Sequence, residues 1–200
     1  TDLALTAAGG FPGELCKNWK TKSVGTFDCE FGYSCMGYEI PAGIGVRMAR
    51  PQHEAFVFIG DGTYLMNPTE LVMAVQEGLK VTVVLSENHA FQSICNLQAA
   101  RAGRDFGNEF RTRNPRSQRL DGDYLTIDFA ANAASLGACT WRVATVEELR
   151  SAEKAIAASS SSGEDAATDA GAVCSASSRV EDDDPSAAAS SLACRGRRDA

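Results

Sequence analysis

Short apolar runs alternate with longer amphipathic stretches over residues 1–157. Four runs are apolar enough to lie buried on both faces of a sheet, which is typical of parallel strands; they span residues 3–7, 55–59, 81–85 and 139–143. Helix-forming stretches between and after them predict helices over residues 34–49, 67–77, 128–136 and 145–157. This alternation predicts an α/β fold, a doubly wound parallel sheet with helices on both faces.

The composition changes near residue 157, and this change sets the predicted domain boundary. Residues 158–200 are rich in Ala, Ser and Asp and contain no aromatic side chain. Such a segment buries too little apolar surface to offset the entropy that it would lose on ordering. We therefore expect one folded domain over residues 1–157 and a disordered low-complexity tail over residues 158–200.

Charge and cysteine content exclude several classes of protein. The net charge of -7 disfavours a polyphosphate partner, so nucleic acid is not expected to bind. No apolar run approaches the length of about eighteen residues that a membrane span needs, so no membrane partner is expected. The 7 cysteines are widely spaced and form no C-x-x-C pair, a pattern typical of reduced thiols in a cytoplasmic protein.

Two predicted strands are followed by residues suited to binding a metal and an anion. Gly60, Asp61, Gly62 and Thr63 come directly after the second strand, and the two glycines allow a tight turn. Asn88 follows the third strand, so Asp61 and Asn88 are expected side by side at one edge of the sheet. Carboxylate and amide oxygens suit magnesium or calcium, and magnesium usually completes its coordination with phosphate oxygens and water. Taken alone, the Gly-Asp-Gly sequence is equally typical of an ordinary turn.

The spacing between Gly60-Asp61-Gly62 and Asn88 resembles the cofactor motif of thiamine-diphosphate-dependent enzymes of the acetolactate synthase type. Residues 32–45, which begin Gly-Tyr-Ser-Cys-Met-Gly, are similar to the segment that receives the aminopyrimidine ring of the cofactor in that superfamily. More narrowly, four segments resemble the trihydroxycyclohexane-1,2-dione hydrolase family of inositol catabolism; they are residues 7–15, 30–40, 106–115 and 119–122. The resemblance runs from about residue 7 to about residue 150.

The resemblance implies a magnesium site and a thiamine diphosphate site. Magnesium would be bound by Asp61, by the side-chain oxygen of Asn88 and by the main-chain carbonyl of Ala90. The diphosphate would be contacted by Gly60, Gly62 and Thr63.

The same resemblance assigns the aminopyrimidine ring to the segment around Ser34. The carbonyl of Ser34 would accept a hydrogen bond from the ring amine, and the amide of Met36 would donate to a ring nitrogen. The Met36 side chain would hold the cofactor in the bent shape in which its own amine removes a proton from the reactive carbon.

The resemblance places no catalytic residue in this chain, because the glutamate that activates the cofactor in this superfamily lies on a separate pyrimidine-binding domain. It implies that the chain is the carboxyl-terminal, cofactor-binding part of an enzyme, inactive alone. The partner domain would lie in the same longer chain or in another subunit, and the complete enzyme would be a homo-oligomer.

Three functions follow as hypotheses. The first is a hydrolase that cleaves a carbon–carbon bond in a cyclic polyol dione, and residues 106–122 favour it. The second is a carboligase or decarboxylase of the acetolactate synthase type. The third is a cofactor-binding fragment without activity.

Two further features are open to more than one interpretation. His89 is expected to face solvent from a loop rather than to carry protons. A basic stretch between the third and fourth predicted strands is either a solvated connection or a lid over an anionic product; its arginines are Arg101, Arg104, Arg111, Arg113, Arg116 and Arg119.

Overall fold

Parallel strands form a 6-stranded sheet in the computed structural model, which describes residues 2–159 and 172–177. The strand order is β2-β1-β3-β4-β6-β5, and every pair of neighbours is parallel. The strands are β1 (Leu3–Thr6), β2 (Phe27–Cys29), β3 (Ala55–Gly60), β4 (Thr82–Glu87), β5 (Cys139–Val143) and β6 (Ala172–Ser177). The predicted parallel sheet is confirmed, with β1, β3, β4 and β5 within one or two residues of the expected positions.

The chain divides into two compact units. Among the described residues, the first contains 2–87, 128–159 and 172–177, and the second contains 88–127. The helices are α1 (Gly10–Asn18), α2 (Glu39–Ala49), α3 (Asp61–Tyr64), α4 (Glu70–Gln76), α5 (Gln92–Ala102), α6 (Phe129–Ser135) and α7 (Val146–Ser159). Of these helices, α5 alone lies in the described part of the second unit. No helix among the described residues is both long and apolar enough to cross a membrane.

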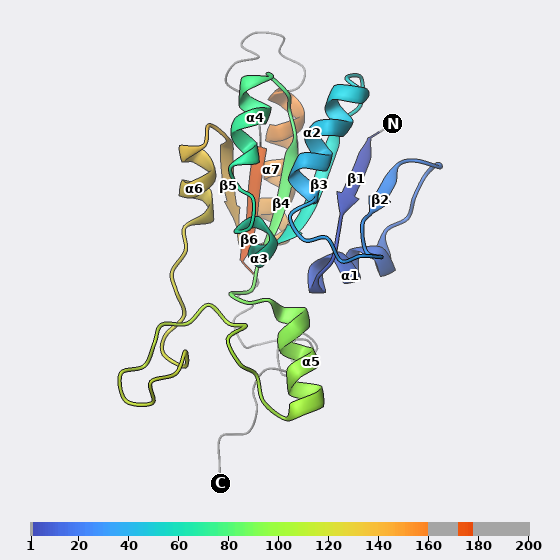
Figure 1. Ribbon diagram of the computed structural model, residues 1–200. Helices are drawn as coiled ribbons and strands as arrows, with labels where there is room; N and C mark the ends of the chain where they lie inside the picture. Colours follow the sequence, from blue (N-terminus) through green and yellow to red (C-terminus); the bar gives the residue numbers. More distant parts are fainter. Residues whose placement is uncertain (1, 160–171, 178–200) are drawn as a thin grey trace. The chain divides into compact units, whose positions relative to one another are not determined.

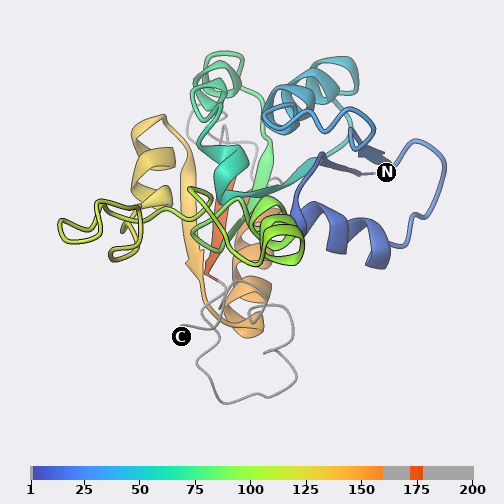
Figure 2. The ribbon, with the colours of Figure 1, turned by 60° about the horizontal axis from the view of Figure 1, so that its bottom comes forward.

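Helices cover both faces of the sheet in the first unit (Figures 1 and 2). Successive side chains of β3 point to opposite faces. Val57 is fully buried on the face covered by α2, where Gly43 lies directly over it. The next residue, Phe58, meets Phe11 of α1, with ring centroids 6.3 Å apart. The views show α2 and α4 on one face and α1 and α7 on the other, so the predicted doubly wound arrangement is confirmed.

Gly43 allows α2 to lie close to the sheet. A Cβ atom at this position would stand 2.6 Å from Cγ2 of Val57 and 3.0 Å from Cγ1 of Val81. Since both neighbours are fully buried, neither has room to move. We expect Gly43→Ala to lower the free energy of unfolding by about 1–3 kcal/mol through overpacking, measured by urea denaturation.

Gly45 in the same helix is the matched control, because a Cβ atom there meets no atom within 4 Å. Gly45→Ala should raise stability by about 0.5–1 kcal/mol, since alanine favours a helix interior. Equal effects of the two substitutions would contradict the close approach of α2 to the sheet.

Two helices begin later than the sequence pattern predicts. Ser34 has a φ of 56° and Gly37 a φ of 92°, and left-handed residues cannot continue a right-handed helix, so α2 begins at Glu39. Pro68 disfavours helical geometry at Asn67, and α4 begins at Glu70.

The expectation of disorder after residue 157 is wrong for two short segments. α7 extends to Ser159, and Ala172–Ser177 form β6, which pairs with β4 and with β5. A strand between two neighbours gains backbone hydrogen bonds on both edges whatever its side chains, and this gain does not depend on the apolar burial that composition reflects. The rest of the predicted tail, residues 160–171 and 178–200, lies outside the described residues.

Four described cysteines are free thiols: Cys16, Cys29, Cys35 and Cys139. Cys95 takes part in a disulfide. The expectation of reduced thiols is therefore wrong at Cys95.

Candidate cofactor-binding site

Asp61 lies at the carboxyl end of β3, where it begins the short helix α3. Its side chain is buried, and its Oδ1 accepts a hydrogen bond of 2.8 Å from the amide of Gly62. Gly62 and Thr63 are buried beside it. The structure therefore brings Gly60, Asp61, Gly62 and Thr63 together in one tight turn at the edge of the sheet, where ligands bind in doubly wound folds.

The side chain of Tyr64 anchors this turn to α6. Its hydroxyl donates to Oδ1 of Asn132 at 2.8 Å, and its ring meets Phe129 edge-on, with centroids 5.7 Å apart. Burial raises the pKa of Tyr64 to about 12. Tyr64 is thus a neutral, fully buried anchor that holds α3 in place.

The register between β3 and β4 puts the ends of both strands at one edge. Gly60 is opposite Ser86, and Glu87 is the last residue of β4. Asn88 is the next residue in the chain. A Cβ atom on Gly60 would meet no atom within 4 Å, so the main chain of β3 faces open space beside the Asp61 turn.

Ser34 and Met36 lie in one tight turn before α2. The amide of Met36 donates to the carbonyl of Ser34 at 3.0 Å, and the amide of Ser34 donates to the carbonyl of Phe31 at 3.3 Å. Ser34 is exposed and Met36 is half-buried. The two main-chain groups expected to bind the aminopyrimidine ring are thus brought side by side, at an accessible position.

Glu39, which the sequence reasoning missed, is a fully buried carboxyl group at the start of α2. Its Oε2 accepts a hydrogen bond of 3.0 Å from the amide of Gly37, whereas its Oε1 has no partner among the described residues. Burial raises the pKa of Glu39 to about 7. The carbonyl of Gly37 also accepts a hydrogen bond from Nδ2 of Asn67, at 3.4 Å. The side chains of Glu39 and Asn67 therefore both hold Gly37, next to the turn that contains Ser34 and Met36. The sequence signal that could have identified Glu39 is an acidic residue at an otherwise apolar helix start.

Asn88 and Ala90 belong to the second unit and lie in one turn. The Oδ1 atom of Asn88 accepts a hydrogen bond of 3.2 Å from the amide of Ala90. The intervening His89 has a φ of 59°, in the left-handed region. The two oxygen ligands expected from this segment are therefore close neighbours on one short stretch of chain.

The prediction that His89 faces solvent is wrong. It is half-buried, and its ring stacks on Tyr124 with centroids 5.2 Å apart and an interplanar angle of 30°. The contact joins residues far apart in the sequence, which local reasoning could not anticipate.

Arg111 differs from the other arginines of the basic stretch. It is half-buried and pairs with Glu109, whereas Arg101, Arg104, Arg113, Arg116 and Arg119 are exposed. The hydrogen bond that Arg111 donates to Glu109 raises the pKa of Arg111 above its ordinary value. Burial, and then the hydrogen bond that Tyr124 donates to Glu109, raise the pKa of Tyr124. At Arg111, therefore, the stretch is neither a solvated connection nor free to meet an anionic ligand.

An apolar cavity of about 510 Å³ lies between α7 and the sheet, away from the Asp61 turn. Phe56, Phe58 and Val84 line it on the strands, and Leu149 and Ile156 line it on α7. It reaches Glu54 and Lys80, which precede β3 and β4, whereas Asp61 follows the opposite end of β3. The cavity is therefore not part of the candidate site.

The chain is similar to named dione hydrolases over most of its length. It is 44% identical over 152 residues to 3D-(3,5/4)-trihydroxycyclohexane-1,2-dione hydrolase 2 of Bacillus cereus, a match that covers 76% of this chain and 24% of that protein. The hydrolase of the same name from Bacillus thuringiensis is 43% identical over 150 residues, which cover 75% of this chain and 23% of that protein. The chain thus spans about a quarter of the length of these curated relatives.

A solved structure and a family model identify the domain. The thiamine diphosphate-dependent 4-hydroxybenzoylformate decarboxylase of Rhodococcus jostii matches with a TM-score of 0.66 and 19% identity, over 87% of this chain and 29% of that chain, and so shares the fold. The family described as "Thiamine pyrophosphate enzyme, C-terminal TPP binding domain" matches residues 7–163. The chain therefore belongs to the thiamine pyrophosphate enzyme family and corresponds to its carboxyl-terminal cofactor-binding domain.

Proposed function

We propose that this chain is the magnesium- and thiamine-diphosphate-binding part of a 3D-(3,5/4)-trihydroxycyclohexane-1,2-dione hydrolase, an enzyme that cleaves a carbon–carbon bond in a cyclic polyol dione. The observation that carries the cofactor assignment is the buried Asp61 turn at the end of β3, in register with the end of β4. The identity of 44% to a dione hydrolase supports this substrate over the acetolactate synthase alternative.

The donor set fits magnesium. Asp61 offers a carboxylate, Asn88 a side-chain amide oxygen and Ala90 a main-chain carbonyl. These are hard oxygen ligands, which suit magnesium better than zinc or copper. A cation bound at the buried Asp61 carboxylate would be favoured by the attraction between opposite charges, which is strong where water is excluded.

The Asp61 turn also fits a diphosphate. The open space beside Gly60 would let phosphate oxygens approach the main chain closely, and Gly62 and Thr63 would contribute backbone or hydroxyl donors. In the turn before α2, the Met36 amide and the Ser34 carbonyl are bonded to each other, and the aminopyrimidine ring would replace that bond by accepting from the Met36 amide and donating to the Ser34 carbonyl. The Met36 side chain would then lie beneath the cofactor.

Bound thiamine diphosphate supplies an electron sink for cleavage of the carbon–carbon bond. The role of this chain is to bind and orient that cofactor, and none of its residues is assigned to proton transfer. The proton-transferring glutamate would lie on a pyrimidine-binding domain, in the same longer chain or in another subunit of a homo-oligomer. The match covers only 24% of the relative's length, which supports a further domain, and we propose that the chain alone is inactive.

Calorimetric titration of the full chain with thiamine diphosphate tests the cofactor assignment. We expect heat of binding in the presence of magnesium and none when a chelator removes it, because the diphosphate would be held through the metal. Binding that is equally tight in both conditions would contradict the magnesium assignment.

Product analysis tests the reaction. The chain mixed with a purified pyrimidine-binding partner should convert the cyclic dione and not pyruvate. Turnover of pyruvate instead would favour a carboligase or decarboxylase, and no turnover with either substrate would favour an inert cofactor-binding fragment.

A further inference from the structure

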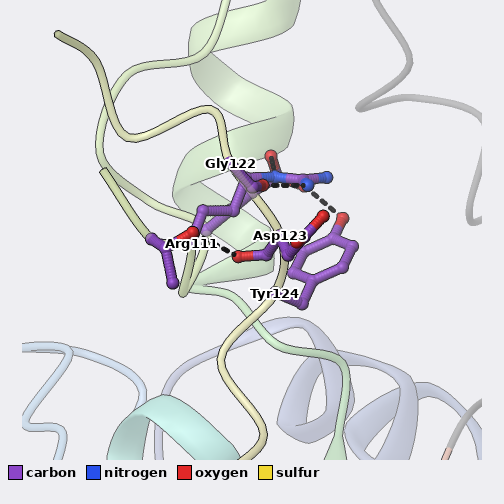
Figure 3. Close-up of polar contacts among 6 residues, drawn as sticks. Arg111, Gly122, Asp123 and Tyr124 are labelled. Atoms are coloured by element: carbon purple, nitrogen blue, oxygen red, sulfur yellow. Dashed lines mark hydrogen bonds and ion pairs between the residues drawn. The ribbon is translucent and has the colours of Figure 1, made fainter. Parts of the chain in front are cut away.

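Three side chains of the second unit, Glu109, Arg111 and Tyr124, form what we call the Tyr124 cluster. Arg111 Nε lies 2.7 Å from Glu109 Oε2, and the Tyr124 hydroxyl donates to Glu109 Oε1 at 2.6 Å. The Cζ atom of Arg111 lies 3.6 Å from the centroid of the Tyr124 ring, so the two side chains lie against each other (Figure 3). The side chains of Arg111 and Glu109 are only 18% and 16% exposed, which makes this ion pair a fixed feature rather than a mobile surface pair, and Tyr124, at 39% exposed, is held by its contacts with both.

Backbone pairing joins the cluster to the turn at His89. Ala90 is bridged to Glu109, and Arg111 is bridged to Tyr124, both antiparallel. The amide of Phe110 donates to the carbonyl of His89 at 2.8 Å. Glu109 and Arg111 flank Phe110 in the chain, so the residues that build the cluster also hold the main chain of His89.

The left-handed conformation of His89 requires support, because this region is unfavourable for residues other than glycine. The stacking of its ring on Tyr124 provides a contact that only a fixed aromatic neighbour offers. This conformation turns the chain so that the Asn88 side-chain oxygen and the amide of Ala90 meet at 3.2 Å. The geometry of the proposed metal ligands Asn88 and Ala90 thus depends on His89, which Tyr124 holds in place.

We propose that the Tyr124 cluster is a positioning device: through the stack of Tyr124 on His89, it holds the turn that presents Asn88 and Ala90 to magnesium. This inference rests on the proposed function. Tyr124 and His89 are positioning residues, since they act on the metal through the Asn88–Ala90 turn.

Magnesium titrated calorimetrically into the full chain, at saturating thiamine diphosphate, tests the proposal. Tyr124→Ala should weaken magnesium binding roughly tenfold, the lower end of what loss of a supporting residue costs a metal site. Tyr124→Phe keeps the ring and should stay within about threefold of the unmodified chain. Phe106→Ala, which removes an exposed aromatic ring from the same unit, is the matched control and should change the affinity less than about twofold.

A double-mutant cycle with His89→Gly separates positioning from general damage. Glycine adopts left-handed geometry without steric strain, so the turn no longer needs Tyr124. In the His89→Gly background, Tyr124→Ala should therefore change the magnesium affinity by less than about twofold. Hydrogen exchange of the Phe110 amide, measured without metal, should be accelerated by Tyr124→Ala in the original background and not in the glycine background. Tyr124→Leu, which keeps apolar bulk but not the stack, replaces Tyr124→Ala if that variant does not fold.

An equal loss of magnesium affinity in both backgrounds, or no loss in either, overturns the positioning role and leaves the proposed function standing. Failure of the unmodified chain to bind magnesium with thiamine diphosphate overturns both. The two failures are therefore distinguishable in one series of titrations.

Discussion

Replacement of Asp61 by asparagine is expected to weaken magnesium-dependent binding of thiamine diphosphate by at least about 100-fold, because the loss of a direct metal ligand should reduce the affinity more than the loss of a supporting residue does. Asp61 is the only carboxylate in the proposed ligand set, and its loss leaves a divalent ion with neutral oxygens alone. The affinity is measured by titrating thiamine diphosphate into the full chain at fixed magnesium concentration.

Asparagine is more informative than alanine at this position. It keeps an oxygen that can accept the hydrogen bond from the Gly62 amide, whereas alanine leaves that buried amide unpaired, at a cost of about 1–3 kcal/mol in stability. Asp121→Asn, at an exposed carboxylate of the second unit, is the matched control and should leave the affinity unchanged. An Asp61→Asn chain that binds as tightly as the original would remove the magnesium site from the proposal.

The second large effect is a pH dependence of stability that originates at Glu39. Its pKa of about 7 in the folded chain lies above the ordinary carboxyl value of 4.5. Between these two pH values the folded state holds a proton that the unfolded state has released, so the free energy of unfolding falls as the pH rises. The stabilisation by protonated Glu39 is therefore complete below about pH 4.5 and is lost by about pH 7. The loss is on the order of 3 kcal/mol when this shift is converted to free energy.

Glu39→Gln isolates this contribution. Glutamine stays neutral and can still accept the hydrogen bond from Gly37, so at pH 8 the variant should be more stable than the original chain, while near pH 4.5 the two should be similar. Urea denaturation at several pH values measures the difference, and Glu14→Gln at an exposed helix position is the control. A variant that is less stable at pH 8 would mean that a positively charged partner compensates the buried carboxylate.

The strands that could be predicted are those whose own side chains are apolar enough to require burial. β3 and β4 are runs of Val, Ile, Phe and Leu that need both faces covered, and their order along the chain implies a parallel sheet. β2 is a half-buried strand of three residues, and β6 consists mainly of small residues. Both exist because neighbouring strands offer backbone partners, which no pattern within the segments indicates.

The candidate site divides in the same way. Gly60 to Thr63 form one continuous turn after a predictable strand, and Asn88 and Ala90 form another, so local sequence together with the family resemblance was enough to propose these ligands. Glu39 and the Tyr124 cluster could not. The burial of Glu39 depends on how α2 packs on the sheet, and Tyr124 meets His89 across 34 intervening residues.

The sequence by itself determined the strands β1, β3, β4 and β5, the helices α2, α4, α6 and α7 and the residue types offered to a metal and a diphosphate, because periodicity and turn chemistry act over a few neighbouring residues. Only the tertiary structure decided which groups become buried, strained or stacked. The raised pKa of Glu39 and the left-handed conformation of His89 both depend on neighbours brought together by folding, and desolvation and ring contacts act through space rather than along the chain.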